Sequence, residues 1–260
     1  MKTSREPVYL NAQGAYSELT VIIPTLNEAS VIGFLLDDLA KRYSGATVLV
    51  VDDVSSDGTQ QVVLERVSVL GSGGGCCSVE LLERRGALVR GICASVIDAI
   101  YCCKTKFFLV MDGDFQHPPS EVAKLFSKLI DGADLVVANR LSRYFGHSVL
   151  RSIISRIATA LARVSLRRRG IVVSDPMSGF FGGKTSFVVG ILKTSSVNFE
   201  LRGYKILFDI LRFFPPNASI AHVHYRFGCR EVGKSKLGVR HAVCFVRSLV
   251  KDISAGKKNS

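Results

Sequence analysis

A short apolar segment that ends in two carboxylates constrains the fold of this chain more than any other feature. Residues 107–111 read Phe-Phe-Leu-Val-Met, and Asp112 and Asp114 follow directly. An apolar run of this length is typical of a strand that is buried on both faces of a sheet. Pro118–Pro119 then ends the strand and favours a helix that begins at Ser120. The sequence therefore predicts an α/β fold with an acidic pair at the carboxyl end of a buried strand.

The acidic pair has a chemical and a purely structural interpretation. In an open α/β sheet, ligands bind at the edge formed by the carboxyl ends of the strands. Two carboxylates one residue apart can share a hard cation such as Mg²⁺ or Mn²⁺, which in turn holds a diphosphate. A bare Asp-x-Asp is more often a solvated acidic turn, but residues 112–118, Asp-Gly-Asp-Phe-Gln-His-Pro, form a far more specific string. Within it, His117 is a ligand or base, or it packs beside the strand end.

Strand-like and helix-like segments alternate around this strand, which is typical of βαβ units and a parallel sheet. We expect further strands at residues 19–24, 47–51, 79–82 and 135–138, and helices at 30–43, 59–68, 87–102 and 120–131. The first two strands end in polar clusters, at residues 24–28 and 52–59. Parallel strands present their carboxyl ends together, so these clusters should meet the acidic pair. The turn Asp57-Gly58-Thr59 is equally well explained as a helix cap.

Charge and length limit the class of protein. The 260 residues, 47% of them hydrophobic, suit one sizeable α/β domain with appendages. The formal charge of +12 predicts an anionic partner, which is nucleic acid, a phosphorylated substrate or an acidic lipid surface. Residues 1–18 lack the apolar core of a secretory signal, so we expect a cytosolic protein. No run approaches the ~18–20 apolar residues of a membrane span, so any membrane contact should be peripheral.

Residues 149–166 predict an amphipathic helix. Its apolar stripe consists of Leu150, Ile153, Ile154, Ile157, Leu161 and Val164, and its arginines lie off the stripe at 151, 156, 163 and 167. Such a helix either packs on the core with its arginines in solvent or lies in a membrane surface against anionic head groups. Residues 242–253 predict a second helix of the same kind.

Six motifs follow one another in this chain, at residues 24–28, 52–59, 112–118, 174–181, 203–207 and 227–237. They read Pro-Thr-Leu-Asn-Glu, Asp-Asp-x-Ser-x-Asp-Gly-Thr, Asp-x-Asp-x-Gln-His-Pro, Ser-Asp-Pro-Met-Ser-Gly-Phe-Phe, Gly-Tyr-Lys-Ile-Leu and Phe-x-x-Arg-x-x-Gly-x-Ser-Lys-Leu. In this order they resemble the family 2 inverting glycosyltransferases. Within that family they are most similar to dolichol-phosphate mannose synthases and related polyprenyl-phosphate glycosyltransferases.

The resemblance implies a nucleotide-diphospho-sugar transferase fold of the GT-A type, with a central, mostly parallel mixed sheet flanked by helices. It implies that the nucleotide-sugar is bound by Pro24, Leu26, Glu28, Val51, Asp53, Asp112, Gln116 and Arg140. It implies phosphate contacts for Arg140, Arg156, Lys205, Arg230 and Lys236. It implies that Asp112, Asp114 and Gln116 serve catalysis, with Mg²⁺ or Mn²⁺ held by Asp112 and Asp114. Taken singly, the cationic residues would be ordinary surface side chains.

The implied reaction is the inverting transfer of mannose from GDP-mannose to dolichyl or polyprenyl phosphate. The implied location is the cytosolic face of a membrane, the endoplasmic reticulum in a eukaryote or the plasma membrane in a prokaryote. Attachment would use the amphipathic helices or a small membrane-spanning partner subunit, and nucleic acid would not be a partner. Two alternatives stay open, a family 2 enzyme that uses UDP-glucose or another sugar nucleotide, and a non-enzymatic module that binds anionic lipid or RNA.

The chain then divides into three parts. We expect a flexible N-terminal arm at residues 1–18 and a catalytic domain at residues 19–238 that includes the helix at 149–166. Residues 239–260 should hold the second amphipathic helix and a polar tail. The family often has tyrosine where this chain has Leu26, and more glycine and lysine where it has residues 84–88.

Overall fold

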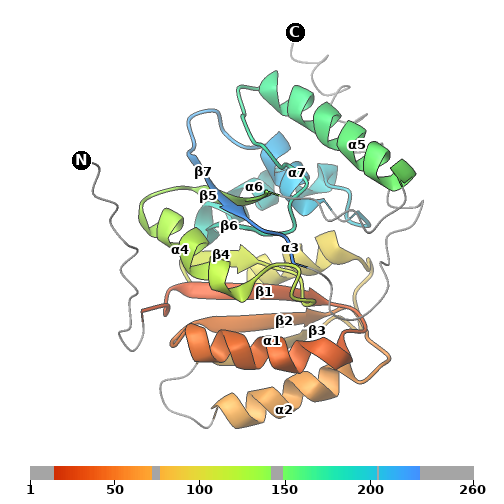
Figure 1. The fold of residues 1–260 in the computed structure, drawn as a ribbon, viewed down its shortest axis with the longest axis vertical. Coiled ribbons are helices and arrows are strands. Elements are labelled where there is room, and N and C mark those ends of the chain that lie inside the picture. The colour runs from red at the N-terminus through yellow and green to blue at the C-terminus, as the bar shows by residue number, and fades with distance from the viewer. Residues whose placement is uncertain (1–14, 72–76, 142–148, 204, 229–260) are drawn as a thin grey trace.

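The computed structural model describes residues 15–71, 77–141, 149–203 and 205–228, with side chains of the helix that starts at residue 149 described from Ile157 onward. The strands are β1 (Leu19–Thr25), β2 (Thr47–Asp52), β3 (Ser78–Glu83), β4 (Phe107–Val110), β5 (Leu135–Arg140), β6 (Phe181–Lys184) and β7 (Ile220–Tyr225) (Figure 1). The α-helices are α1 (Ala29–Arg42), α2 (Thr59–Gly71), α3 (Ile92–Cys102), α4 (Val122–Ile130), α5 (Val149–Arg167), α6 (Thr185–Ser195) and α7 (Ile206–Arg212). Short 3₁₀ turns lie at η1 (Pro119–Glu121) and η2 (Ser196–Asn198).

The described strands form one seven-stranded sheet in the order β3-β2-β1-β4-β6-β5-β7. β6 runs antiparallel to its neighbours β4 and β5, and every other neighbouring pair is parallel. This confirms the predicted α/β fold with a central, mostly parallel mixed sheet. Because β2, β1 and β4 are parallel neighbours, their carboxyl ends meet at one edge of the sheet. The three polar segments that follow these strands therefore start side by side.

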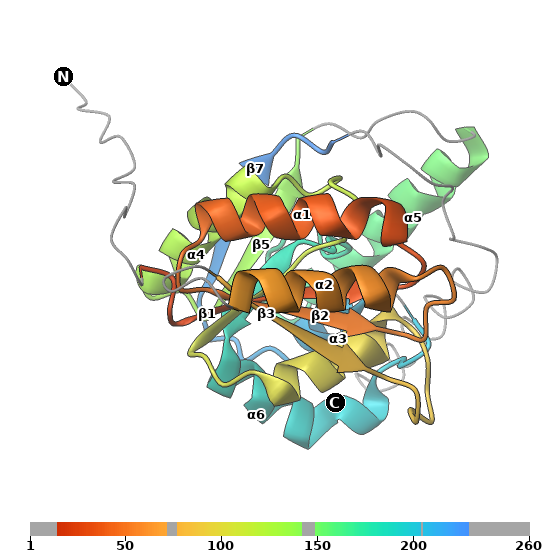
Figure 2. The same ribbon diagram turned by 90° about the horizontal axis from the view of Figure 1, so that it is seen from below.

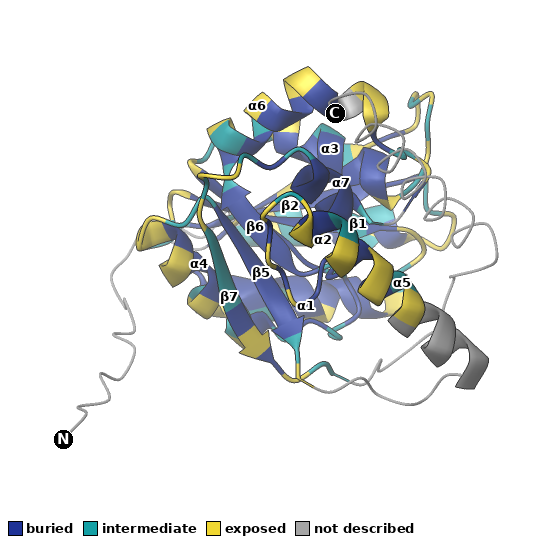
Figure 3. Ribbon diagram, turned by 90° about the horizontal axis from the view of Figure 1, so that it is seen from above, coloured by how far each residue is buried: buried dark blue, intermediate teal, exposed yellow. Residues whose placement is uncertain are grey.

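Side chains that alternate along the central strands are buried on both faces of the sheet. Val21 and Leu109 pack with the apolar sides of α1 and α4. Ile22 and Val110 point the other way, into the core formed with α3, α6 and α7. Figure 2 shows the two helical layers on opposite sides of the sheet, and Figure 3 shows the buried strands between them. Burial on both faces explains why β4 is apolar at every position.

Helix α3 begins at Ile92, so the prediction of a helix from residue 87 is wrong at this boundary. Two local features delay the helix. Gly91 has a φ of 134°, which is outside the helical region and is open to glycine. The carbonyl of Val89 accepts a hydrogen bond of 2.7 Å from the Arg84 guanidinium. Residues 84–91 therefore form a loop whose shape depends on side-chain contacts rather than on helical propensity.

Strand β6 lies between β4 and β5, and it is not among the predicted strands because it reads only Phe-Gly-Gly-Lys. Its second residue, Gly182, faces Leu109 of β4 in the ladder. A Cβ atom at Gly182 would lie closer than 3.0 Å to the carbonyl oxygen of Phe108 and to the Leu109 side chain, a separation that Cβ atoms essentially never show. Glycine is therefore required where β6 approaches the strand that carries the acidic pair.

Helix α5 contacts the core through a face other than its predicted apolar stripe. Ala162 and Leu166 are buried against the core that includes α7. Three described members of the stripe, Ile157, Leu161 and Val164, are exposed by 55%, 51% and 51%. Of the two interpretations of this helix, packing of the stripe on the core is therefore wrong for these three side chains. Among the described residues, no helix is both long and apolar enough to cross a membrane.

Candidate active site

The turn after β4 places its two carboxylates in different surroundings. The Asp112 side chain is 42% exposed, whereas Asp114 is buried. Asp114 Oδ1 accepts a hydrogen bond of 3.1 Å from the backbone N–H of Gln116. Phe115, which lies between Asp114 and Gln116, has a φ of 61°. This left-handed backbone conformation occurs where the chain bends within the motif. One carboxylate thus faces outward while the other is held by the turn.

This geometry suits a hard cation whose remaining ligands come from a substrate. In the described part of the chain, no group of three or more His, Cys, Asp or Glu side chains is arranged to hold a metal ion. Mg²⁺ in proteins is usually bound by one or two carboxylates together with water and substrate phosphates, rather than by an all-protein cage. The residues Asp112 and Asp114 therefore fit an ion that binds together with a diphosphate.

His117 is buried and orients the backbone of the acidic turn. Its Nδ1 accepts a hydrogen bond of 2.9 Å from the backbone N–H of Asp112, and its ring stacks on Phe180 at 5.0 Å between centroids. Burial lowers the pKa of His117, although the charges of Asp112 and Asp114 oppose this effect. A neutral ring with an unprotonated Nδ1 makes no ion pair with the Asp112 carboxylate 3.7 Å away. Of the roles considered for His117, packing beside the strand end is the one observed.

Arg140, at the end of β5, is oriented by Asp175. Its Nε donates a hydrogen bond of 2.8 Å to Asp175 Oδ2, and its guanidinium lies 5.4 Å from the centroid of the Phe227 ring. Burial alone would lower the pKa of Arg140, but the charge and hydrogen bond of Asp175 raise it. Because the guanidinium is a rigid fork, an anchored Nε sets the direction of the remaining N–H groups.

Lys205 lies within electrostatic range of Arg140 and Asp112. Its Nζ donates a hydrogen bond of 3.1 Å to the carbonyl of Met177. Burial, together with the positive charge of Arg140, lowers the pKa of Lys205 to about 7. An anion bound beside these two cations would favour the protonated form of Lys205. The pair Arg140 and Lys205 therefore suits a phosphate group at the acidic edge of the sheet.

The first two loops of this edge are tied together by side-chain caps. Asp57 accepts hydrogen bonds of 3.0 Å from the backbone N–H groups of Ala29, the first residue of α1, and Thr59, the first residue of α2. The Thr59 hydroxyl in turn accepts the N–H of Glu28 at 2.9 Å. Burial alone would raise the pKa of Asp57, but the hydrogen bonds that it accepts from the Thr59 hydroxyl and from the N–H groups of Ala29 and Thr59 lower it. The capping interpretation of Asp57-Gly58-Thr59 is thus confirmed.

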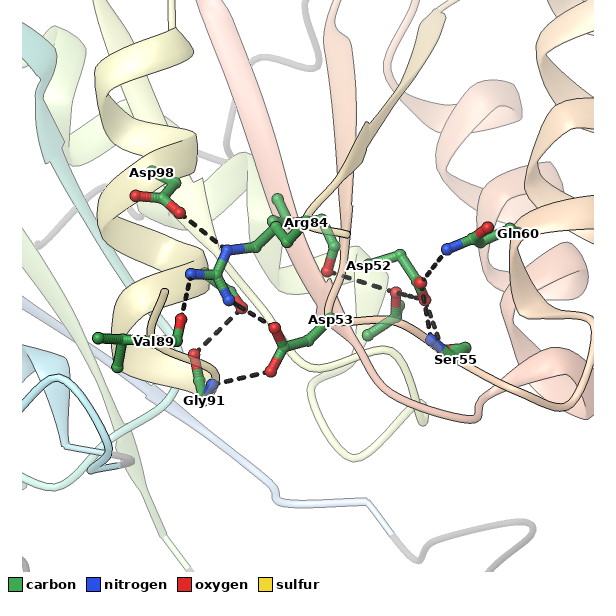
Figure 4. Close-up of polar contacts among 11 residues, drawn as sticks. Asp52, Asp53, Ser55, Gln60, Arg84, Val89, Gly91 and Asp98 are labelled. Atoms are coloured by element: carbon green, nitrogen blue, oxygen red, sulfur yellow. Dashed lines mark hydrogen bonds and ion pairs between the residues drawn. The ribbon is translucent and has the colours of Figure 1, made fainter. Parts of the chain in front are cut away.

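Two adjacent carboxylates after β2 point in opposite directions (Figure 4). Asp52 is fully buried and accepts hydrogen bonds from Thr25, Ser55 and Gln60. Asp53 turns the other way, toward Arg84 and the start of α3. Asp52 therefore holds the loops in place, while Asp53 lies at the side of the sheet that faces α3.

The structure brings most of the predicted site residues to one edge. Pro24 and Val51 are paired across β1 and β2, although the Val51 side chain lies wholly within the core. Leu26 is 42% exposed, and Glu28 is half-buried. Three residues predicted to contact phosphate, Arg156, Arg230 and Lys236, lie outside the described side chains. The predicted C-terminal segment 239–260 and most of the predicted N-terminal arm also lie outside the described residues.

The sheet order, the reversed β6 and the acidic pair after β4 together form a GT-A fold. The chain matches glucosyl-3-phosphoglycerate synthase from Mycobacterium tuberculosis in complex with Mn²⁺, uridine diphosphate and glucosyl-3-phosphoglycerate, with a TM-score of 0.65 and 17% sequence identity. The match covers 91% of this chain and 78% of that one. The same enzyme with Mg²⁺ and uridine diphosphate matches with a TM-score of 0.64 and 18% identity, covering 91% of this chain and 79% of that one. At this identity the likeness establishes the fold.

Residues 20–191 match the family model for glycosyl transferase family 2, and the chain belongs to this family. It is 30% identical over 241 residues to a dolichol-phosphate mannosyltransferase of Saccharomyces cerevisiae, covering 89% of this chain and 85% of the relative. The enzyme of the same name from Mycosarcoma maydis is 30% identical over 245 residues, 89% of this chain and 77% of the relative. That from Pyrococcus furiosus is 30% identical over 85% of this chain, which spans 59% of the relative's length. The protein is therefore a glycosyltransferase.

Proposed function

We propose that this enzyme transfers mannose from GDP-mannose to dolichyl or another polyprenyl phosphate, giving a β-linked lipid phosphate sugar. The observation that carries the proposal is the arrangement at one sheet edge. The Asp112–Asp114 turn follows β4, Arg140 ends β5 and is held by Asp175, and Lys205 bonds to the carbonyl of Met177, with the charge of Asp112 acting on both cations. Such an edge has both the carboxylates for a metal–diphosphate and the cations for a phosphate. Relatives that are 30% identical over most of the chain carry the name dolichol-phosphate mannosyltransferase, which supports the mannosyl group and the lipid phosphate acceptor.

The chain's own residues account for the chemistry through binding and electrostatics. A divalent cation between Asp112 and Asp114 would supply charge neutralisation for the departing diphosphate. Arg140, anchored by Asp175, and Lys205 orient phosphate oxygens through charge-assisted hydrogen bonds. The acceptor phosphate is already anionic, so it can attack the anomeric carbon without a general base. The neutral, buried His117 agrees with such a reaction, because Nδ1 is engaged with the backbone.

The choice of donor is tested by turnover of a panel of sugar nucleotides against dolichyl phosphate, with and without Mn²⁺. We expect kcat/KM for GDP-mannose to exceed that for UDP-glucose by about tenfold or more, since base and sugar contacts act on transition-state binding. Transfer should require the acceptor and fall on chelation of the metal. A preference for UDP-glucose would select the alternative donor. Absence of transfer to dolichyl phosphate from every sugar nucleotide would contradict the proposed acceptor.

A membrane-resident acceptor requires the enzyme to reach lipid head groups, and α5 offers a surface for this contact. Ile157, Leu161 and Val164 form an exposed apolar stripe, and Arg167 and Arg168 at the end of the helix are exposed. Basic amphipathic helices bind the interface of anionic membranes reversibly. We propose that α5 contacts the cytosolic face of the membrane that holds the acceptor, either directly or beside a small membrane-spanning partner subunit.

We expect the purified chain to co-sediment with acidic phospholipid vesicles and to detach at about 1 M salt, where charges are screened within about 3 Å. Leu161→Gln should weaken vesicle binding. Val69→Gln is a matched control, because Val69 is 68% exposed on α2, which lies at the end of the molecule far from α5 (Figure 1). If the chain does not bind such vesicles but fractionates with membranes in cells, direct attachment through α5 is wrong and attachment through a partner subunit is favoured.

A further inference from the structure

Arg84, the residue after β3, is buried at the centre of a polar cluster that the proposed reaction does not use (Figure 4). Its Nη1 donates hydrogen bonds to Asp53 Oδ1 at 2.5 Å and to Ser95 Oγ at 3.1 Å. Its Nε donates to Asp98 Oδ2 at 2.8 Å, and its Nη2 to the carbonyl of Val89 at 2.7 Å. With its side chain only 4% exposed, the guanidinium is engaged within the protein rather than presented to a ligand.

These contacts fix the position of Asp53. While Oδ1 accepts from Arg84, Oδ2 accepts the backbone N–H of Gly91 at 2.8 Å. The Asp53 side chain nevertheless keeps 10% of its surface exposed. Each carboxylate oxygen has a second acceptor position, so Asp53 can still accept a hydrogen bond from a ligand. Arg84 and Gly91 together hold the carboxylate in one orientation at the end of β2.

The same cluster connects the end of β2 to the segment that precedes Lys205. Gly91 lies against the backbone of Leu201 and Arg202, since a Cβ atom there would come within 3.4 to 3.6 Å of it. The N–H of Cys93, in the first turn of α3, donates to the carbonyl of Gly203 at 3.4 Å. Arg84 therefore stabilises a loop, residues 84–91, that packs between Asp53 and the chain leading to the phosphate-binding lysine.

We propose that Arg84 is a positioning residue for the nucleoside half of the sugar nucleotide, acting through Asp53 and through loop 84–91. This inference rests on the proposed function and on the nucleotide contact that the family resemblance implies for Asp53. The planar guanidinium suits the task because its N–H groups meet four acceptors in fixed directions. A lysine at this position would keep the charge but could not hold Asp53, Asp98 and the Val89 carbonyl at once.

The neighbouring arginine provides a matched control. Arg85 has a side chain that is 71% exposed, and it pairs with Glu83 and with the Gln60 side chain. Among the described residues, its side chain pairs with these two rather than with Asp53, Asp98 or the Val89 carbonyl, so Arg85→Met removes the same charge at the adjacent position without touching the partners of Arg84.

The test compares binding of GDP, UDP and inorganic pyrophosphate by calorimetry in the presence of Mn²⁺. For Arg84→Met and Arg84→Lys we expect the Kd of the preferred nucleoside diphosphate to rise by about tenfold or more, as when one partner of a buried charge pair is removed. The Kd of pyrophosphate should stay within about twofold of the wild-type value, because pyrophosphate has no nucleoside half. KM for the sugar nucleotide should rise more than kcat falls. Arg85→Met should bind both ligands as the wild type does.

Two outcomes would overturn the positioning role. One is an unchanged Kd of the nucleoside diphosphate in both Arg84 variants. The other is an equal loss of pyrophosphate and nucleotide binding, which is the result of a merely structural defect. If Arg84→Met does not fold, Arg84→Lys carries the comparison. If the wild-type chain binds UDP more tightly than GDP, the proposed donor is wrong, and the Arg84 variants are then compared with UDP as the ligand. Failure of the proposed donor is therefore distinguishable from failure of the positioning role.

Discussion

Replacing Asp114 by alanine should lower the rate of sugar transfer by about 10³-fold, equivalent to about 4 kcal/mol of transition-state stabilisation. The reason is that the departing diphosphate would lose the cation that this carboxylate helps to hold. Asp114 follows β4 rather than belonging to it, so the strand pairing should persist. The measurement is the initial rate at saturating sugar nucleotide with Mn²⁺, accompanied by Mn²⁺ binding followed by electron paramagnetic resonance.

Asp131→Ala is the control for loss of an acidic side chain elsewhere. Asp131 is exposed at the end of α4, where its nearest cation is Lys128 at 3.9 Å. Its replacement should leave the rate within about twofold of wild type, as surface substitutions usually do. An Asp114→Ala enzyme that retains activity within about tenfold of wild type, a loss of only about 1.4 kcal/mol, would contradict the assignment of Asp114 to the metal–diphosphate site.

Replacing Gly182 by alanine should lower the free energy of unfolding by about 3 kcal/mol or more, as expected when a packed core is overfilled. The added methyl group would overlap the backbone carbonyl of Phe108, which cannot rotate away as a side chain can. Because β4 would have to move, and Asp112 lies two residues beyond its end, metal and nucleotide binding should weaken as well. Urea denaturation measures the first effect, and calorimetric titration of the folded fraction measures the second.

Gly190→Ala supplies the matched control on α6. A Cβ atom at Gly190 would meet nothing within 4 Å, and the residue lies inside a helix. Alanine should therefore stabilise the protein by about 0.5–1 kcal/mol, because it is the better helix former. Gly182→Ala with an unchanged urea midpoint would show that β6 does not approach β4 as closely as the structure has it.

The position of the acidic pair could be predicted from local sequence, whereas its surroundings could not. An apolar run followed by Asp112 and Asp114 is enough to place both carboxylates at the end of a buried strand. The roles of Asp175 and Arg84 were not predicted, because their partners lie 35 and 31 residues away in the chain. The sequence showed only that these residues lie in segments compared with the family, Asp175 within residues 174–181 and Arg84 within residues 84–88.

The boundaries show the same division between local and distant causes. Strands β1, β2 and β5 were predicted to within two residues because the alternation of apolar and polar segments is local. The start of α3 was misplaced by five residues, since Arg84 draws the carbonyl of Val89 out of the helix. β6 escaped prediction because two glycines remove the apolar pattern of a strand.

By itself, the sequence determined the α/β class, the common edge of the first strands and the acidic pair, because hydrophobic periodicity and turn residues act over a few positions. Only the tertiary structure decided that β6 runs antiparallel between β4 and β5, and that His117 packs neutral behind Asp112. It alone decided that the described part of the α5 stripe faces outward. These features depend on which distant surfaces bury one another. The periodicity of a segment shows that it has a face to bury, but it does not identify the distant segment that covers this face.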